Sequence, residues 1–135
     1  KRGVRIVTGG TDNHLVLVDV RQFGITGRQA ESALEESGVV VNRNSIPFDP
    51  NGAWYTSGIR LGTPALTSLG MAESEMDEVA DIICSTLQDT EPRTTSSGEN
   101  SKAQFKLSDK VRDTNRSRAG DLLTKNPLYP DLHLL

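Results

Sequence analysis

The sequence has little of what several classes of protein depend on. It has a single cysteine, which excludes an internal disulfide, and aromatic residues make up only 4% of its positions. No hydrophobic run approaches the roughly eighteen residues of a membrane span, and the first residues lack the pattern of a signal peptide. The net charge of -3 gives no basic surface for nucleic acid. We therefore expect a cytoplasmic protein that contacts neither membranes nor nucleic acids.

Length and composition bound the architecture. With 135 residues, of which 35% are hydrophobic, the chain is large enough for one domain with a single core. The scarcity of aromatic residues makes this core mostly aliphatic. The sequence opens with Lys1-Arg2-Gly3, which is the pattern of a helix end closed by glycine. We therefore expect the chain to be a fragment of a longer protein.

Hydrophobic periodicity predicts alternating strands and helices. Strands are predicted over 4–7, 14–20, 39–41 and 57–61, and helices over 27–36, 72–87 and 108–125. Thr26 and Ser108 are the predicted N-caps of the first and last helices. Residues 9–13 have turn chemistry, so the first two strands should pair antiparallel. The buried helix positions are predicted to be Met76, Val79, Ala80, Ile83, Leu87, Val111, Ala119, Leu122 and Leu123.

These elements predict an α+β fold. We expect a two-layer small domain, with a three- to four-stranded, mainly antiparallel sheet and helices on one face. Residues 1–90 should form this domain, 91–107 a linker, and 108–135 a C-terminal helix and tail that pack on the same domain. The stretch 89–100 holds no large apolar residue and predicts a solvated segment. The polar run 113–117 in the last helix offers little to bury.

One arginine stands in a hydrophobic setting between turn residues. In SGIRLG, residues 57–62, the alternation of an extended strand points Ile59 and Leu61 to one face and Arg60 to the other. A guanidinium is planar, forked and always charged, so its best partner is a carboxylate or phosphate held by two parallel hydrogen bonds. The alternative is an ordinary arginine on the solvent face of a short strand.

Three segments of the sequence form an ordered set. The first is VTGGTDNHLVLVD at residues 7–19, and the second joins Thr26-Gly27 to Ala30-Glu31. The third is VNRNSIPFDPNGAWYTSGIRLGTPAL at residues 41–66. Together they resemble the C-terminal domain of serine hydroxymethyltransferase. Within this last segment, residues 51–55 replace a proline-containing stretch that is usual in the family, so we expect this loop to be more mobile.

The resemblance implies an activity, a cofactor and two site residues. Enzymes of this family use pyridoxal 5'-phosphate to interconvert serine plus tetrahydrofolate with glycine plus 5,10-methylenetetrahydrofolate, and they work as homodimers or tetramers. By resemblance, Arg60 holds the carboxylate of the amino acid and Asn44 contacts folate. For Asn44, a backbone-capping role before the Ser-Ile-Pro turn is the alternative. The family's Schiff-base lysine and other cofactor-binding residues lie in a large upstream domain. We therefore expect this chain to pack against that domain and to be inactive alone.

Other reactive side chains do not form a site in the sequence. Asp12, His14 and Asp19 could suggest an acid–base group, but His14 opens a hydrophobic strand, where a hydrogen-bonded structural imidazole is expected. Cys84 lies among hydrophobic residues of a helix and is expected to be a buried small hydrophobe. No group of residues has metal-ligand spacing. Gly9-Gly10 is not followed at once by a helix, which argues against a phosphate-binding loop.

Two functions from different classes follow from these observations. In the first, the chain is the substrate- and folate-binding domain of a hydroxymethyltransferase, and the cofactor is bound elsewhere. In the second, it is an autonomous, non-catalytic binding module that retains the fold and the anion-binding arginine. A coding sequence for a cofactor domain immediately upstream of Lys1 would favour the first.

Overall fold

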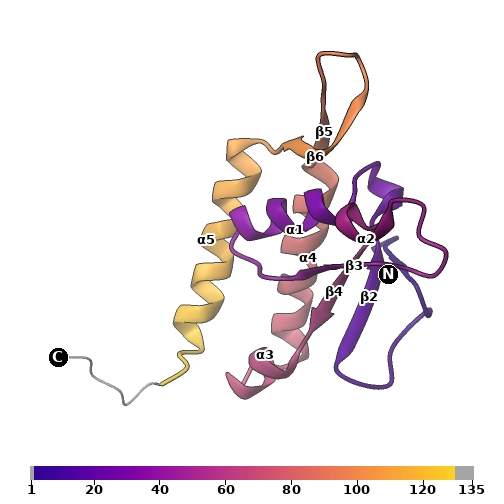
Figure 1. The fold of residues 1–135 in the computed structure, drawn as a ribbon. Coiled ribbons are helices and arrows are strands. Elements are labelled where there is room, and N and C mark those ends of the chain that lie inside the picture. The colour runs from indigo at the N-terminus through magenta and orange to yellow at the C-terminus, as the bar shows by residue number, and fades with distance from the viewer. Residues whose placement is uncertain (1, 130–135) are drawn as a thin grey trace.

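A four-stranded antiparallel sheet lies at the centre of the computed structural model, which describes residues 2–129 (Figure 1). The strand order is β1-β2-β4-β3. The strands are β1 (Arg5–Ile6), β2 (Leu15–Asp19), β3 (Asn42–Asn44) and β4 (Gly58–Gly62). β1 and β2 pair antiparallel, as predicted from the turn between them. The predicted α+β class with a mainly antiparallel sheet is confirmed.

Three longer helices accompany the sheet. They are α1 (Gly27–Glu36), α4 (Glu73–Asp89) and α5 (Asp109–Lys125), each within two residues of the predicted bounds. Three short helical turns were not predicted: η1 (Arg21–Phe23), α2 (Gly52–Tyr55) and α3 (Pro64–Ser68). Across residues 2–129, none of the helices combines the length and apolar character that crossing a bilayer requires.

The core lies between one face of the sheet and the helices α1 and α4. Val18 and Ile59 from the sheet pack in one cluster with Leu34 from α1 and Leu87 from α4, all at most 2% exposed. The cluster is aliphatic, as the composition predicts. At roughly 1.5–3 kcal/mol for each buried Val, Leu or Ile, this cluster holds the helices on that face. The opposite face of the sheet is left for the site.

Helix α1 begins at the residue that the sequence indicates. The side-chain oxygen of Thr26 accepts a hydrogen bond from the backbone N–H of Gln29 at 3.2 Å. The Gln29 side chain in turn accepts from the backbone N–H of Thr26 at 2.9 Å. This capping box satisfies two N–H groups that the first turn of a helix leaves free. The predicted N-cap is therefore confirmed.

The segment expected to be a solvated linker is instead a β-hairpin. β5 (Glu91–Thr94) pairs antiparallel with β6 (Asn100–Lys106), and the hairpin projects from the top of the molecule in Figure 1. Its base is tied to α1, since Thr26 Oγ1 donates to the Lys102 carbonyl at 2.7 Å and Gln29 Nε2 donates to the Ser101 carbonyl at 2.7 Å. Backbone pairing and these polar anchors replace the hydrophobic contacts whose absence suggested a linker. The proposed division at residues 90 and 108 stays a prediction.

The prediction of a strand over 39–41 was also wrong. Val39 instead closes the C-terminus of α1, where its N–H donates to the Leu34 carbonyl at 2.8 Å, and Val40 is 88% exposed. The residues that pair with β4 are the polar ones that follow, Asn42–Asn44. β-branched residues favour strands, but here pairing with a distant strand decides the position.

Helix α5 packs on α4 through a polar residue, which corrects another expectation. Asn115, inside the polar run expected to offer little to bury, is 2% exposed. Its Nδ2 donates to Ser85 Oγ and to Thr86 Oγ1, both at 2.9 Å. Leu123, which was expected to face inward, is 51% exposed. The part of the predicted tail that spans residues 130–135 lies outside the described residues.

Helix α1 and the start of β4 touch at a glycine. The N–H of Gly27 donates to the Thr56 carbonyl at 3.1 Å. A Cβ at position 27 would clash with Thr56 Oγ1 and with the Gly58 carbonyl oxygen. Thr56 itself has a left-handed φ of 57°, which is unfavourable for a β-branched residue. The close approach therefore requires glycine at position 27.

A buried carboxylate ties the first two strands to the turn η1. Asp19 is 2% exposed and receives Arg21 Nη2 at 2.7 Å, with Arg5 Nη1 at 3.5 Å. The hydrogen bonds from the Arg21 side chain hold the pKa of Asp19 below its ordinary value. This ion pair brings together β1, β2 and η1.

We predict that Gly27→Ala destabilises the chain, because the added methyl group meets backbone that cannot move aside. The expected loss in the free energy of unfolding is about 1–3 kcal/mol. Gly120→Ala is the matched control, because a methyl group added at position 120, inside α5, would have no atom of another residue within 4 Å beyond its own helix backbone. That change should stabilise by roughly 0.5–1 kcal/mol. Urea unfolding midpoints measure both, and equal effects of the two changes would show that the contact at position 27 does not require glycine.

We also predict that Asp19→Asn flattens the acid dependence of stability. The folded-state pKa of Asp19 is lowered, so its contribution is present above the unfolded pKa of about 3.9 and is lost as the pH falls through the folded value. Unfolding free energies measured from about pH 6 down to about pH 3 should fall less steeply for the variant than for the parent chain. An unchanged slope would show that Asp19 is not held by Arg21.

Candidate functional site

The candidate site lies on the face of the sheet that faces away from α1 and α4. In β4, Ile59 is fully buried while Arg60 is exposed, as the predicted alternation requires. Arg60 lies directly opposite Leu17 of β2 and Asn42 of β3. Directly opposed residues of antiparallel strands share a face, so these three side chains lie side by side. Arg60 therefore projects from the middle of the open face.

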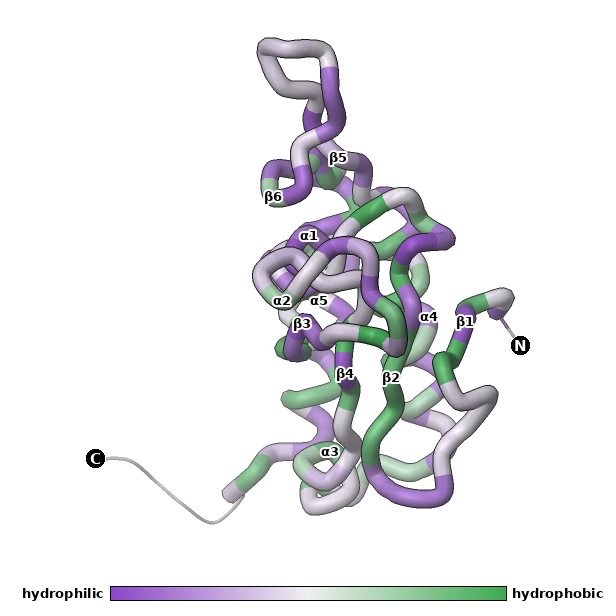
Figure 2. The backbone as a smooth tube through the Cα atoms, turned by 45° about the vertical axis from the view of Figure 1, so that its right-hand side comes forward, coloured by the Kyte–Doolittle hydropathy of each residue, from purple (hydrophilic) through white to green (hydrophobic). Residues whose placement is uncertain are grey.

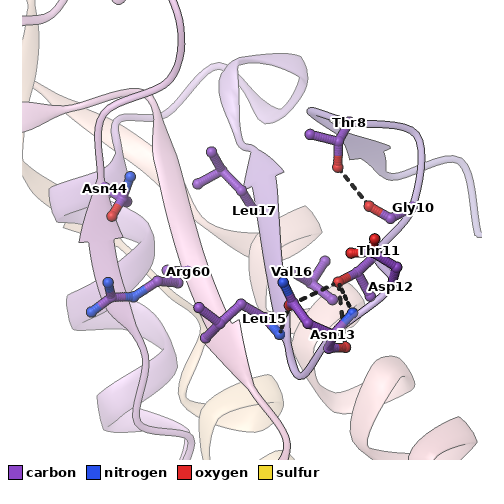
Figure 3. A pocket seen from close by; sticks show the side chains of 10 residues that line it. All are labelled: Thr8, Gly10, Thr11, Asp12, Asn13, Leu15, Val16, Leu17, Asn44 and Arg60. Carbon is purple, nitrogen blue, oxygen red and sulfur yellow. Dashed lines mark hydrogen bonds between the residues drawn. The ribbon is translucent and has the colours of Figure 1, made fainter.

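Asn44 lies on the same face, one strand away from Arg60. It is directly opposite Gly58, which precedes Arg60 by two residues on β4. A Cβ at Gly58 would come within 2.8 Å of the Asn44 carbonyl oxygen and of Ile46 Cγ2, so glycine allows the two strands to approach here. Figure 3 shows the side chains of Asn44 and Arg60 on the same side of the sheet. The two predicted site residues are thus brought together.

An open cavity of about 530 Å³ extends from these residues to the loop between β1 and β2. Its floor is Leu15 and Leu17 of β2, and its far wall is the turn over residues 8–13 (Figure 3). The turn is held by its own polar side chains: Asn13 Oδ1 accepts from the N–H of Leu15 at 2.7 Å. The sequence analysis assigned no site residue to this turn. Its position beside the arginine depends on the pairing of β2 with the distant strand β4, which no local signal describes.

Arg60 is a free cation within the described residues. Its guanidinium has no hydrogen-bond or ion-pair partner among residues 2–129, whereas six other arginines there form ion pairs with carboxylates. The cavity also contains the exposed carboxylate of Asp12 on the turn. The unpartnered guanidinium of Arg60, beside the hydrophobic side chains of Leu15 and Leu17, can bind a small anion.

Within residues 2–129, the side-chain amide of Asn44 uses one of its hydrogen-bonding groups and leaves the others free. Its Nδ2 donates to the carbonyl of Ser45 at 2.7 Å, so one N–H is used by the chain itself. This bond matches the alternative expectation of a capping role. The Oδ1 atom and the second N–H are not engaged by it, and together they offer an acceptor beside a donor. Such a pair suits the polar edge of a heterocycle.

The other reactive residues do not join this site. His14 is exposed rather than a structural imidazole, and only its backbone is fixed, by the Thr63 N–H that donates to its carbonyl at 3.2 Å. Asp19 lies at the opposite end of β2, where Arg21 binds it. Cys84 is half-buried on α4, and burial raises the pKa of its thiol. In the described part of the chain, no three His, Cys, Asp or Glu side chains are grouped to ligate a metal.

The loop from β3 to β4 contains side-chain contacts that the sequence alone does not reveal. The ring of Trp54 on α2 makes cation–π contacts with the guanidinium groups of Arg28 and Arg43, which lie 5.2 Å and 5.3 Å from its centroid. Asp49 accepts four hydrogen bonds within the loop. An Asp between two prolines is a recognised turn signal, but its partner Ser57 is found only in the folded structure.

Comparison with known proteins agrees with the resemblance in the sequence. The profile of the family described as serine hydroxymethyltransferase matches residues 1–83. A serine hydroxymethyltransferase of Cutibacterium acnes is 58% identical over 135 residues, which cover 99% of this chain and 28% of the relative. Those of Mycolicibacterium smegmatis and Salinispora tropica are 57% and 56% identical over 134 residues, covering 99% of this chain and 26% and 28% of the relatives.

The chain therefore spans little more than a quarter of the length of these relatives, at 26–28%. The aligned stretch covers 99% of this chain, so it includes β1 to β4 with Arg60, Asn44 and the cavity, and the hairpin and α5 beyond the profile match. The profile match over residues 1–83 and the relatives near 57% identity together establish the family of this chain. This chain belongs to the serine hydroxymethyltransferase family.

Proposed function

We propose that this chain forms the part of a serine hydroxymethyltransferase that binds the amino-acid carboxylate and one edge of the folate. The whole protein would interconvert serine plus tetrahydrofolate with glycine plus 5,10-methylenetetrahydrofolate. Arg60 would hold the carboxylate of serine or glycine, and Asn44 would contact the folate ring. The observation that carries the proposal is the unpartnered guanidinium of Arg60 in a chain of this family. Arg60 lies two residues after Gly58, which is directly opposite Asn44.

The geometry supports binding of a small amino acid and a heterocycle side by side. A bidentate guanidinium–carboxylate contact fixes the direction of the Cα substituents, which lets an enzyme orient the bond that breaks. The hydrophobic floor of Leu15 and Leu17 gives the ligand an apolar surface next to this grip. Asn44 is near enough in register to contact a second ligand beside the first.

The residues of this cavity do not fit the cofactor itself. Pyridoxal phosphate, the family's cofactor, would supply the electron sink and needs a lysine for its Schiff base. No lysine lines the cavity around Arg60, whose lining is Thr8, Gly10, Thr11, Asp12, Asn13, Leu15, Val16, Leu17, Asn44 and Arg60. We therefore assign the cofactor to the large domain of the family, and the chain by itself would be inactive. The working protein would be a homodimer or tetramer, as in the family.

For the full-length enzyme we predict that Arg60→Ala lowers kcat/KM for serine by at least about 100-fold. Loss of two charged hydrogen bonds, at about 1.5–3 kcal/mol each, sets this scale. Arg60→Lys should recover only a part, because it keeps the charge and loses the fork. Arg116→Ala, an exposed arginine on α5, is the control and should leave kcat/KM unchanged. Near-normal turnover in the Arg60→Ala enzyme would refute the assignment.

We predict that Asn44→Ala weakens tetrahydrofolate binding by roughly 5- to 30-fold, which corresponds to one or two lost hydrogen bonds. Glycine binding, measured separately, should change little. The matched control is Asn42→Ala, because Asn42 is an exposed asparagine on the same face of β3 that does not line the cavity. Unchanged folate affinity in the Asn44→Ala enzyme would eliminate the folate role and leave the capping role.

A further inference from the structure

The carboxylate of Asp49 is the most heavily hydrogen-bonded side chain of the loop that joins Asn44 to Arg60. Oδ2 accepts from the backbone N–H of Ile46 at 3.1 Å and from that of Ser57 at 2.8 Å. Oδ1 accepts from the backbone N–H of Asn51 at 2.9 Å and from Ser57 Oγ at 2.7 Å. One side chain thus joins the end of β3 to the start of β4.

The hydrogen bond to Ile46 reaches Asn44 through a single peptide group. The N–H of Ile46 and the carbonyl of Ser45 belong to the same planar unit. Asp49 binds the N–H of that unit, and the Asn44 amide donates to its carbonyl at 2.7 Å. Because the peptide is planar, fixing the N–H also fixes the direction in which the carbonyl points. The Asn44 amide is therefore oriented by a group that Asp49 holds.

Within residues 2–129, no further hydrogen bond holds this peptide. β3 ends at Asn44, so the sheet ladder does not extend to Ser45 and Ile46. Phe48, next to Asp49, has a left-handed φ of 55° and is fully exposed, so burial of its ring does not hold the turn. The unfavourable backbone is kept in place by the hydrogen bonds of Asp49.

The charge state of Asp49 suits this role. Burial by itself would raise the pKa of the Asp49 carboxyl, but the hydrogen bonds it accepts, that of the Ser57 side chain foremost, outweigh burial and leave the pKa below its ordinary value. The group is therefore an ionised carboxylate at neutral pH, with acceptors only. The four groups that bond to it, from Ile46, Asn51 and Ser57, all act as donors, so an acceptor-only carboxylate satisfies each of them.

We propose that Asp49 is a positioning residue for the folate side of the site: it orients the Asn44 amide through the Ser45–Ile46 peptide, so that Oδ1 and one N–H of Asn44 face the cavity. The inference rests on the proposed folate role of Asn44 and adds the reason why that amide has one orientation. Asp49 does not touch a ligand itself. Its effect should be confined to tetrahydrofolate and should vanish when Asn44 is absent.

The test is a double-mutant cycle in the full-length enzyme. Asp49→Asn keeps the shape of the side chain and places an NH2 group against two N–H or O–H donors. We expect the KM for tetrahydrofolate to rise roughly three- to tenfold, the effect of one weakened hydrogen bond. The dissociation constant of glycine should stay within about twofold, because Arg60 is held by the sheet ladder. Adding Asp49→Asn to Asn44→Ala should raise the KM no further.

Ser57→Ala is the matched control. It removes one hydrogen bond from the same carboxylate but leaves the bond to the Ile46 N–H in place. It should lower the melting temperature while the KM for tetrahydrofolate stays unchanged, which separates positioning from general stability. If Asp49→Asn does not fold, Asp49→Glu keeps the carboxylate at a longer reach and serves in the same cycle, with a smaller expected rise.

The outcomes are distinct. A rise in KM for tetrahydrofolate that disappears in the Asn44→Ala background supports the inference. The same rise in both backgrounds, or no rise with Asp49→Asn while Asn44→Ala does weaken binding, overturns the positioning role and leaves the proposed function intact. No effect of Asn44→Ala itself overturns the folate role and this inference with it.

Discussion

The site depends on the register of β4 between its two neighbours. Ile59 is fully buried, and because side chains alternate along a strand, its burial directs Arg60 to the opposite face. A slip by one residue would move the guanidinium into the hydrophobic core, where an unpaired charge is far more costly than any single contact is favourable. The same register sets Arg60 opposite Leu17 and Gly58 opposite Asn44. The register of β4 therefore determines both the core packing and the geometry of the site.

The hydrophobicity of β2 shows that its outer face is not an ordinary solvent face. A sheet with one wet side alternates hydrophobic and polar residues. β2 instead reads Leu-Val-Leu-Val before Asp19 and is hydrophobic along most of its length in Figure 2. Val16 and Val18 face the core, so Leu15 and Leu17 lie on the same side as Arg60. This is the composition of a surface that contacts a ligand or another part of the polypeptide.

Elements with a local signal were predictable from the sequence, and those that depend on distant partners were not. The N-cap at Thr26 and the alternation around Arg60 are encoded in neighbouring residues, and both were predicted correctly. The position of β3 at 42–44 and the hairpin from 91 to 106 are decided by pairing with other strands and by side chains of α1. The role of Asp49 could not be predicted from the sequence, because its bonds to Ser57 exist only once β4 is in place.

The openness of the cavity limits what Arg60 can do in this chain alone. An ion pair between exposed groups contributes about 0–1 kcal/mol, because water competes for both charges. The same guanidinium–carboxylate pair becomes strong when water is excluded and the partners are pre-oriented. Under the proposed function, the part of the protein that covers the Leu15, Leu17 and Arg60 face thus contributes the low dielectric, and this chain contributes the oriented fork. On this proposal neither would be sufficient alone, which would explain on physical grounds why a substrate-binding arginine can lie on a domain that binds substrate weakly by itself.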